Sequence, residues 1–135
     1  MILGIGIDIV SVDRVQYITA EHGERFQGRI LTMVEQSHLP QVNTAEYIAG
    51  RFAAKEAVIK ALGVKHIGLN DIEILNDDNG KPFISNCSNL SQKAGLADVT
   101  LHISISHERD YAVGMAILES ISEKRGQSPG ESGKN

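Results

Sequence analysis

The sequence is poor in the features that mark secreted and membrane proteins. Cys87 is its single cysteine, so no intrachain disulfide can form and no zinc cluster can be built on cysteine. No apolar run approaches the roughly 20 residues of a membrane span. The apolar N-terminus lacks a leading basic region and Asp8 interrupts it, so it does not read as a signal peptide. We expect a cytoplasmic protein that does not enter a membrane.

Positive charge is also scarce. The 13 lysines and arginines are outnumbered by 17 aspartates and glutamates, which gives a net charge of −4. This balance argues against a nucleic-acid binder with a broadly basic surface, although it leaves room for a local basic patch. Hydrophobic residues make up 41% of the 135 residues and charged residues 22%. Such a composition predicts one domain with a packed core.

The N-terminal part predicts a strand followed by helices. Within residues 2–10, Ile5, Ile7 and Ile9 occupy alternate positions, which is typical of a strand with one apolar face. Ser11 follows and can cap a helix. Thr32 and Glu35 have the spacing of a capping box, which predicts that another short helix begins there.

The centre and the C-terminal part predict one long helix and an antiparallel sheet. Residues 44–62 are rich in alanine and other good helix formers. A hairpin follows around Asp78-Asn79-Gly80, and a short helix is expected over 88–97. Residues 99–106 and 111–118 predict paired strands. The fold class is therefore α+β, an antiparallel sheet packed with a long central helix and shorter helices.

The last residues differ in composition from the rest. From Ser120 onward the chain consists largely of serine, glycine, glutamate and lysine. We expect a single domain over 1–119 and a disordered tail over 120–135.

Two carboxylates stand in unusual places. Asp8 interrupts an apolar strand, where aspartate is disfavoured, and it is either a functional group or an edge residue facing water. Glu56 falls within about 60° of Ala49 and Ile59 on a helical wheel, along the stripe expected to face the core. A buried carboxylate is costly unless it is paired or binds a metal. Taken alone, an ion pair with Lys60 one turn later is the commoner explanation.

Together, these residues suit magnesium and a phosphate group. Mg²⁺ prefers oxygen ligands, keeps several waters, and is usually bound by one or two carboxylates and substrate phosphates. Lys60 would suit those phosphates as a point charge. The combination predicts phosphoryl-type chemistry, in which positioning and charge neutralisation do most of the catalysis.

A third candidate region is the end of the strand over 99–106. Ser106 and His107 are adjacent, so their side chains diverge along a strand and do not suggest a nucleophile–base pair. His107 stands where the strand meets a turn and is either an anion contact or an ordinary turn histidine. The sequence has no complete dinucleotide loop, no phosphate loop of the GxxxxGK[ST] kind and no HExxH motif.

These features resemble one family. GIGIDIV, FQGRILT, GRFAAKEAVIKALG, the NGKP hairpin and ISISH with a following YAVG strand are similar, in this order, to bacterial holo-acyl-carrier-protein synthase of the 4′-phosphopantetheinyl transferase family. The resemblance runs from residue 1 to about residue 119. It implies the 4′-phosphopantetheinyl transferase fold in its small form, a homotrimer with active sites at subunit interfaces.

The resemblance also implies roles for individual residues. Asp8 and Glu56 match the magnesium-binding carboxylates, and Lys60 matches the lysine near the coenzyme A pyrophosphate. Ser106 and His107 fall in the segment that contacts coenzyme A phosphates. The remaining residues that fall in regions lining the nucleotide are Arg51, Gly80, Lys81 and Pro82.

The implied reaction is transfer of 4′-phosphopantetheine from coenzyme A to a serine of apo acyl carrier protein, in support of fatty acid biosynthesis. Adenosine 3′,5′-bisphosphate leaves. The group that removes the serine proton is left open, with Glu56 as one candidate. Two alternatives stay open: the acceptor is a carrier domain of a polyketide or peptide synthase, or the chain is a non-catalytic coenzyme A-binding subunit.

A partner surface is expected on the first helices. Carrier proteins of this kind are acidic, and Arg14 and Arg25, with Arg29, form a positive group that could steer such a partner. Arg14 has the stronger case, because the family uses its first helix for docking. The alternative is that Arg25 and Arg29 pair with neighbouring glutamates on a solvated face.

Overall fold

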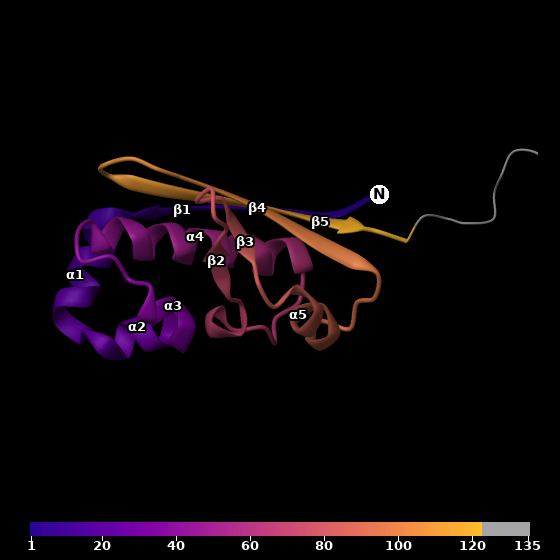
Figure 1. The fold of residues 1–135 in the computed structure, drawn as a ribbon, viewed down its shortest axis with the longest axis horizontal. Helices are drawn as coiled ribbons and strands as arrows, with labels where there is room; N and C mark the ends of the chain where they lie inside the picture. The colour runs from indigo at the N-terminus through magenta and orange to yellow at the C-terminus, as the bar shows by residue number, and fades with distance from the viewer. Residues whose placement is uncertain (123–135) are drawn as a thin grey trace, which may run out of the picture.

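A three-stranded antiparallel sheet and one long helix form the frame of the molecule (Figure 1). The computed structural model describes residues 1–122. Strand β5 (Tyr111–Ser120) lies between β1 (Ile2–Ser11) and β4 (Val99–His107). Helix α4 (Thr44–Leu62) runs along one face of the sheet. The predicted α+β class is confirmed.

Glycines let α4 lie unusually close to the sheet. A Cβ atom added to Gly6 of β1 would lie 1.8 Å from the carbonyl oxygen of Ala57, and one added to Gly114 of β5 would lie 2.3 Å from the backbone nitrogen of Ala54. The facing positions of α4 are alanines, so backbone meets backbone with little side-chain volume between them. The close approach fixes how far each strand residue stands from the helix.

The shorter elements form a third layer on the far side of α4 (Figure 1). At one end lie three helices: α1 (Val12–His22), α2 (Glu24–Ile30) and α3 (Met33–Ser37). Towards the other end lie η1 (Leu69–Asp71), β2 (Ile74–Asn76), β3 (Pro82–Ile84) and α5 (Cys87–Lys93). Within residues 1–122, no helix has the length and apolarity needed to cross a membrane.

The predicted caps and the hairpin are confirmed. Ser11 Oγ accepts a hydrogen bond from the backbone of Arg14 at 3.3 Å. Thr32 and Glu35 form the capping box of α3. Strands β2 and β3 pair in antiparallel register, and their turn contains Gly80 at a φ of 81°, which glycine adopts without strain.

Two predicted boundaries differ from the structure. The short helix expected over 88–97 is α5, Cys87–Lys93, because the chain turns at Gly95 with a φ of 76°. Strand β5 reaches Ser120, one residue into the predicted tail, because Ser120 still pairs with Val99 and bonds to the carbonyl of Met1. The tail prediction for 123–135 lies outside the described residues.

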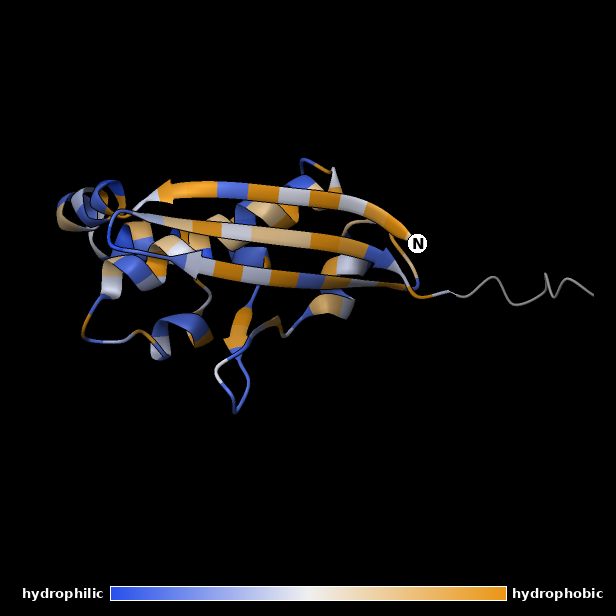
Figure 2. Ribbon diagram, turned by 90° about the horizontal axis from the view of Figure 1, so that it is seen from above, coloured by the Kyte–Doolittle hydropathy of each residue, from blue (hydrophilic) through white to orange (hydrophobic). Residues whose placement is uncertain are grey.

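The apolar face of β1 points away from α4. Ile5, Ile7 and Ile9 are each more than 60% exposed. In the sheet they pair with residues of β5 that include Met115, which is 39% exposed. Figure 2 looks onto this side and shows apolar positions along β1 and β5 with no helix over them. Within residues 1–122 this face of the sheet is uncovered.

Candidate active site

The Gly–Ala contacts bring Asp8 to the turn of α4 that carries Glu56. Asp8 follows Gly6 by two residues on the face that meets the helix, and its partner in β5 is Gly114, which packs on Ala54. Asp8 and Glu56 line one cleft of about 500 Å³. The two carboxylates that the sequence singled out therefore meet.

Electrostatics couples the two carboxylates. Burial raises the pKa of Glu56, the nearby charge of Asp8 raises it further, and Lys60 opposes both effects. Lys60 Nζ donates hydrogen bonds to Asp8 Oδ1 at 3.1 Å and to the carbonyl oxygen of Ile7 at 2.9 Å. The lysine thus forms its ion pair with Asp8 on β1. The i,i+4 ion pair with Glu56, the commoner explanation from sequence, is not the arrangement found.

The cleft fits a magnesium ion that takes some of its ligands from the protein and the rest from a substrate and water. Within residues 1–122 no group of three or more histidine, cysteine, aspartate or glutamate side chains forms a complete metal site. Asp8 and Glu56 supply two carboxylates in an open cleft, and their repulsion is what a cation would relieve. Mg²⁺ commonly takes this number of protein ligands and completes its shell with water and phosphate oxygens.

Glu56 stands at the edge of the core rather than inside it. The wheel position next to Ala49 and Ile59 predicts a core-facing residue, yet Glu56 is half-buried, whereas its neighbour Lys55 is fully buried. Helix α4 is packed on most of its circumference, so an apolar stripe identifies its buried face poorly.

One wall of the same cleft is apolar, and sequence reasoning missed it. Arg14 lies at this cleft, which α1, α2 and α4 line with apolar side chains. The members of this wall are Val15, Ile18, Phe26 and Phe52. The chain has only three phenylalanines, and this scarcity is the sequence signal that could have marked Phe26 and Phe52. In the structure both are only partly buried.

A second pocket, of about 210 Å³, gathers most of the residues expected at the nucleotide. Arg51 is 6% exposed, its Nη2 donates to Asn76 Oδ1 at 2.7 Å, and its guanidinium lies 4.4 Å from the ring centroid of Tyr47. Among the described residues its Nε has no hydrogen-bond partner. His107 Nδ1 lies 3.7 Å from Glu46 Oε2. The hairpin contributes Gly80 and Pro82.

Four predicted site residues line neither pocket, and one of them, Lys60, still contacts Asp8 of the carboxylate cleft. Ser106 is exposed on the open face of the sheet, where it pairs with Val113, opposite to the side of His107. Lys81 is exposed in the hairpin turn, and its backbone nitrogen donates to Asp77 at 2.9 Å. Arg25 is exposed on α2.

The two pockets open on different sides of α4. Arg51 and Glu56 are five residues apart, which corresponds to a rotation of about 140° around the helix. The structure therefore brings Asp8, Glu56 and Lys60 together, and separately Arg51, Pro82 and His107. Within a single chain it does not bring the two groups to one place.

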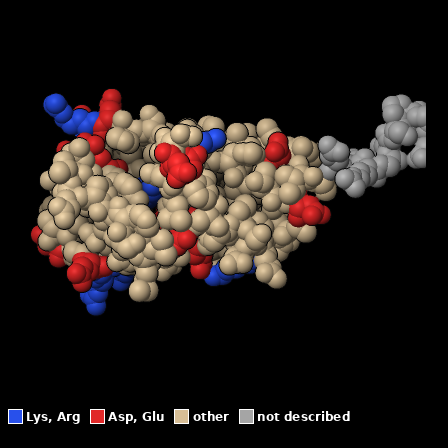
Figure 3. Space-filling view, viewed as in Figure 1, with Lys and Arg blue, Asp and Glu red and all other residues tan. Residues whose placement is uncertain are grey.

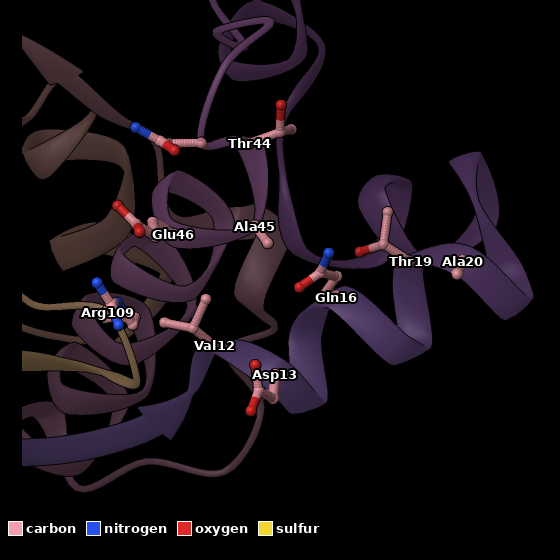
Figure 4. A pocket seen from close by; sticks show the side chains of 10 residues that line it. Val12, Asp13, Gln16, Thr19, Ala20, Thr44, Ala45, Glu46 and Arg109 are labelled. Carbon is pink, nitrogen blue, oxygen red and sulfur yellow. The ribbon is translucent and has the colours of Figure 1, made fainter.

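A third pocket, of about 590 Å³, was not indicated by the sequence (Figure 4). Its lining includes Asp13 and Gln16 on α1, Glu46 at the start of α4 and Arg109 from the β4–β5 turn. Glu46 also lines the pocket of His107, so the two hollows share a wall.

Over residues 1–122, the arginines of the first helices, Arg14, Arg25 and Arg29, take part in no ion pair. In Figure 3, however, basic side chains project beside acidic ones at the α2 end of the molecule. The expected positive group is thus mixed with negative charge on that view.

Comparisons with known proteins show the family of this chain. Residues 4–116 match the family model of the 4′-phosphopantetheinyl transferase superfamily. The holo-[acyl-carrier-protein] synthase of Geobacillus kaustophilus is 45% identical over 127 residues, which cover 90% of this chain and 92% of that protein. The crystal structure of such a synthase from Bacillus anthracis in complex with CoA (3′,5′-ADP) aligns with a TM-score of 0.73 and 39% identity, covering 89% and 98% of the two chains.

A crystal structure of the same kind of enzyme from Neisseria meningitidis aligns with a TM-score of 0.77 and 36% identity, over 89% of this chain and all of that one (100%). Fold, carboxylate cleft and sequence thus define a transferase fold of the phosphopantetheinyl class. The chain belongs to the 4′-phosphopantetheinyl transferase superfamily, which confirms the resemblance found in its sequence motifs.

Proposed function

We propose that this chain transfers the 4′-phosphopantetheine group from coenzyme A to a serine of apo acyl carrier protein. The observation that carries the proposal is the meeting of Asp8 and Glu56 in one cleft beside Lys60. The relatives named holo-[acyl-carrier-protein] synthase support the choice of reaction. Supply of holo carrier protein for fatty acid biosynthesis follows from it.

In this proposal Asp8 and Glu56 hold Mg²⁺. When bound, the ion supplies positive charge for the diphosphate of coenzyme A. Lys60, whose ammonium donates to Asp8 at 3.1 Å, adds a second charge for the same oxygens. With Mg²⁺ bound, Asp8 would lie next to two cations, the metal ion and the Lys60 ammonium. Because these two repel each other, Lys60 can turn from the carboxylate towards a phosphate.

The chemical step is a displacement at phosphorus. The serine oxygen of the carrier protein forms a bond to the phosphorus that bears the pantetheine arm, and the bond from this phosphorus to the bridging oxygen breaks. Adenosine 3′,5′-bisphosphate leaves with the electron pair. The serine proton passes to a base, and Glu56, acting through a water molecule, is our candidate because it lines the same cleft as Asp8.

The pocket of Arg51 and His107 is the proposed seat of the nucleotide. The guanidinium of Arg51 and the imidazole of His107 line this pocket and are groups that can donate hydrogen bonds to phosphate and ribose oxygens. The predicted contacts of Ser106 and Lys81 stay proposals, since both side chains lie outside this pocket in a single chain.

A homotrimer would join the two half-sites. The open face of β1 and β5 exposes Ile5, Ile7, Ile9 and Met115, and contiguous exposed apolar surface marks association sites. We propose that three chains cover this face together. In this arrangement the carboxylate cleft of one chain meets the nucleotide pocket of its neighbour, and the separation of Arg51 and Glu56 by about 140° around α4 supports it.

The carrier protein is proposed to dock on α1 and α2. Arg14 lies beside the apolar wall of the carboxylate cleft, so an acidic partner with an apolar contact would fit it, and Arg25 would extend the contact. Cytoplasmic location stays a prediction from the sequence.

The test is a mass-spectrometric assay on apo acyl carrier protein with coenzyme A. We expect the added mass of phosphopantetheine on the carrier serine, with magnesium required. Carrier domains of polyketide and peptide synthases serve as alternative acceptors, and faster modification of those would change the proposed acceptor. Calorimetry that shows coenzyme A binding without any modification would instead favour a non-catalytic binding subunit.

A further inference from the structure

A buried ion pair lies outside all three pockets. Lys55 and Glu35 have no exposed side-chain surface. Lys55 Nζ donates to Glu35 Oε1 and, at 2.6 Å, to the carbonyl oxygen of Ile30. Glu35 also accepts from the backbone nitrogens of Thr32 at 2.8 Å and Ile74 at 2.9 Å. One pair thereby joins the end of α2, the start of α3, strand β2 and helix α4.

Stability alone is a poor reason for such a pair. The desolvation of two charges offsets most of their attraction, and apolar side chains of similar volume are often as good or better in such a place. Hydrogen bonds differ from apolar contacts because they fix direction and distance. The Glu35–Lys55 pair therefore determines where its four segments meet.

Strand β2 carries this constraint to the nucleotide pocket. Ile74 is its first residue and Asn76 its last. Asn76 accepts from Arg51, which stands one helical turn before Lys55 on α4. Helix α4 thus holds β2 at two points, through the buried pair and through Arg51. Because Asn76 pairs with Pro82, the hairpin wall of the pocket moves with β2.

We propose that Glu35 and Lys55 are positioning residues for the coenzyme A site. They hold the β2–β3 hairpin against α4 at the separation that forms the pocket of Arg51, Pro82 and His107. The identity of the ligand rests on the proposed function, whereas the positioning itself does not.

The test replaces the pair by apolar side chains in the full chain, Glu35→Leu with Lys55→Met. The double variant keeps a buried volume but loses the hydrogen bond to Ile74. We expect the Kd for adenosine 3′,5′-bisphosphate and the KM for coenzyme A to rise about 10-fold or more, because small misplacements are costly in binding sites. We expect kcat at saturating coenzyme A to stay within about threefold.

Backbone amide exchange provides a readout that needs no ligand. We expect exchange at Ile74 and Gly80 to accelerate in the double variant. Lys93→Met is the matched control, since it breaks the exposed ion pair of Lys93 with Asp71 and should leave both exchange and nucleotide affinity unchanged. If the double variant does not fold, Glu35→Gln, which keeps an acceptor but loses the charge, is measured in its place.

Two outcomes separate the proposals. A folded variant with wild-type nucleotide affinity and unchanged exchange at Ile74 would overturn the positioning role. A wild-type chain that does not bind adenosine 3′,5′-bisphosphate would overturn the proposed function, while the exchange data would still decide whether the pair positions the hairpin.

Discussion

Asp8 and Glu56 are the residues on which the proposed chemistry depends most. Asp8→Asn and Glu56→Gln keep shape and polarity but remove one negative charge each. We expect each to lower turnover at least about 100-fold, the scale for losing one charge-stabilising group in an active site. Turnover is measured by mass spectrometry on apo carrier protein. Circular dichroism controls for the fold, and normal turnover in either variant would contradict the metal assignment.

The raised pKa of Glu56 sets the direction of a pH effect. Folding favours the protonated form of Glu56, so its contribution to stability is present below the unfolded pKa and is lost as pH rises through the folded pKa. A metal ligand must be ionised, so acidification should weaken magnesium binding at a higher pH than it would for a glutamate of ordinary pKa. In the metal-free protein, Asp8→Asn should lower the pKa of Glu56 and Lys60→Met should raise it.

Carbon-13 NMR titration of the glutamate side chains measures both shifts. A higher Glu56 pKa in Asp8→Asn would show that the two carboxylates do not interact as described.

At the residue scale, sequence predicts local chemistry better than distant pairing. Asp8 and Glu56 stand out because a carboxylate is anomalous among apolar neighbours. Glu35 was predicted only as part of a capping box, and it does form one. Its pairing with Lys55 could not be predicted, because 20 residues separate the two and the helix pattern gives no sign of which other segment packs there.

At the scale of helices and strands, the most important contact is the close packing of β1 against α4, which we call the seam. Gly6→Ala would place a methyl group 1.8 Å from the carbonyl oxygen of Ala57, so strand and helix must separate. We expect a loss of roughly 1–3 kcal/mol of unfolding free energy, as for other overpacked sites. Urea denaturation measures it. Gly28→Ala on α2 is the control, since its added Cβ meets no atom within 4 Å and should stabilise by about 0.5–1 kcal/mol.

A Gly6→Ala variant as stable as the wild type would contradict the close packing of this seam.

Element boundaries were largely predictable because caps and turns are local signals, such as Ser11 at α1 and Gly63 at α4. The distance between elements was not, because the glycines and alanines that permit close approach also occur where nothing packs.

At the scale of the whole molecule, the uncovered sheet face is the proposed interface between chains, so changes to it test the oligomeric state. Ile7→Asp places a charge at a position that is 61% exposed in the single chain. If the proposed trimer forms, we expect a shift from trimer to monomer in sedimentation velocity and a fall in turnover of about 10-fold or more, because each proposed site combines two chains. Met33→Asp is the control, because Met33 is 86% exposed on α3, away from this face. Unchanged sedimentation of Ile7→Asp would contradict the proposed interface.

Because Arg51 and Glu56 lie on different sides of α4, two inactive variants of the proposed trimer should restore activity when they are mixed. A chain with Asp8→Asn keeps a sound nucleotide pocket, and a chain with Arg51→Ala keeps a sound carboxylate cleft. Mixed at equal amounts and allowed to reassemble, two individually inactive variants would complement each other. With random assortment into rings of three, about a quarter of the junctions would combine two intact halves.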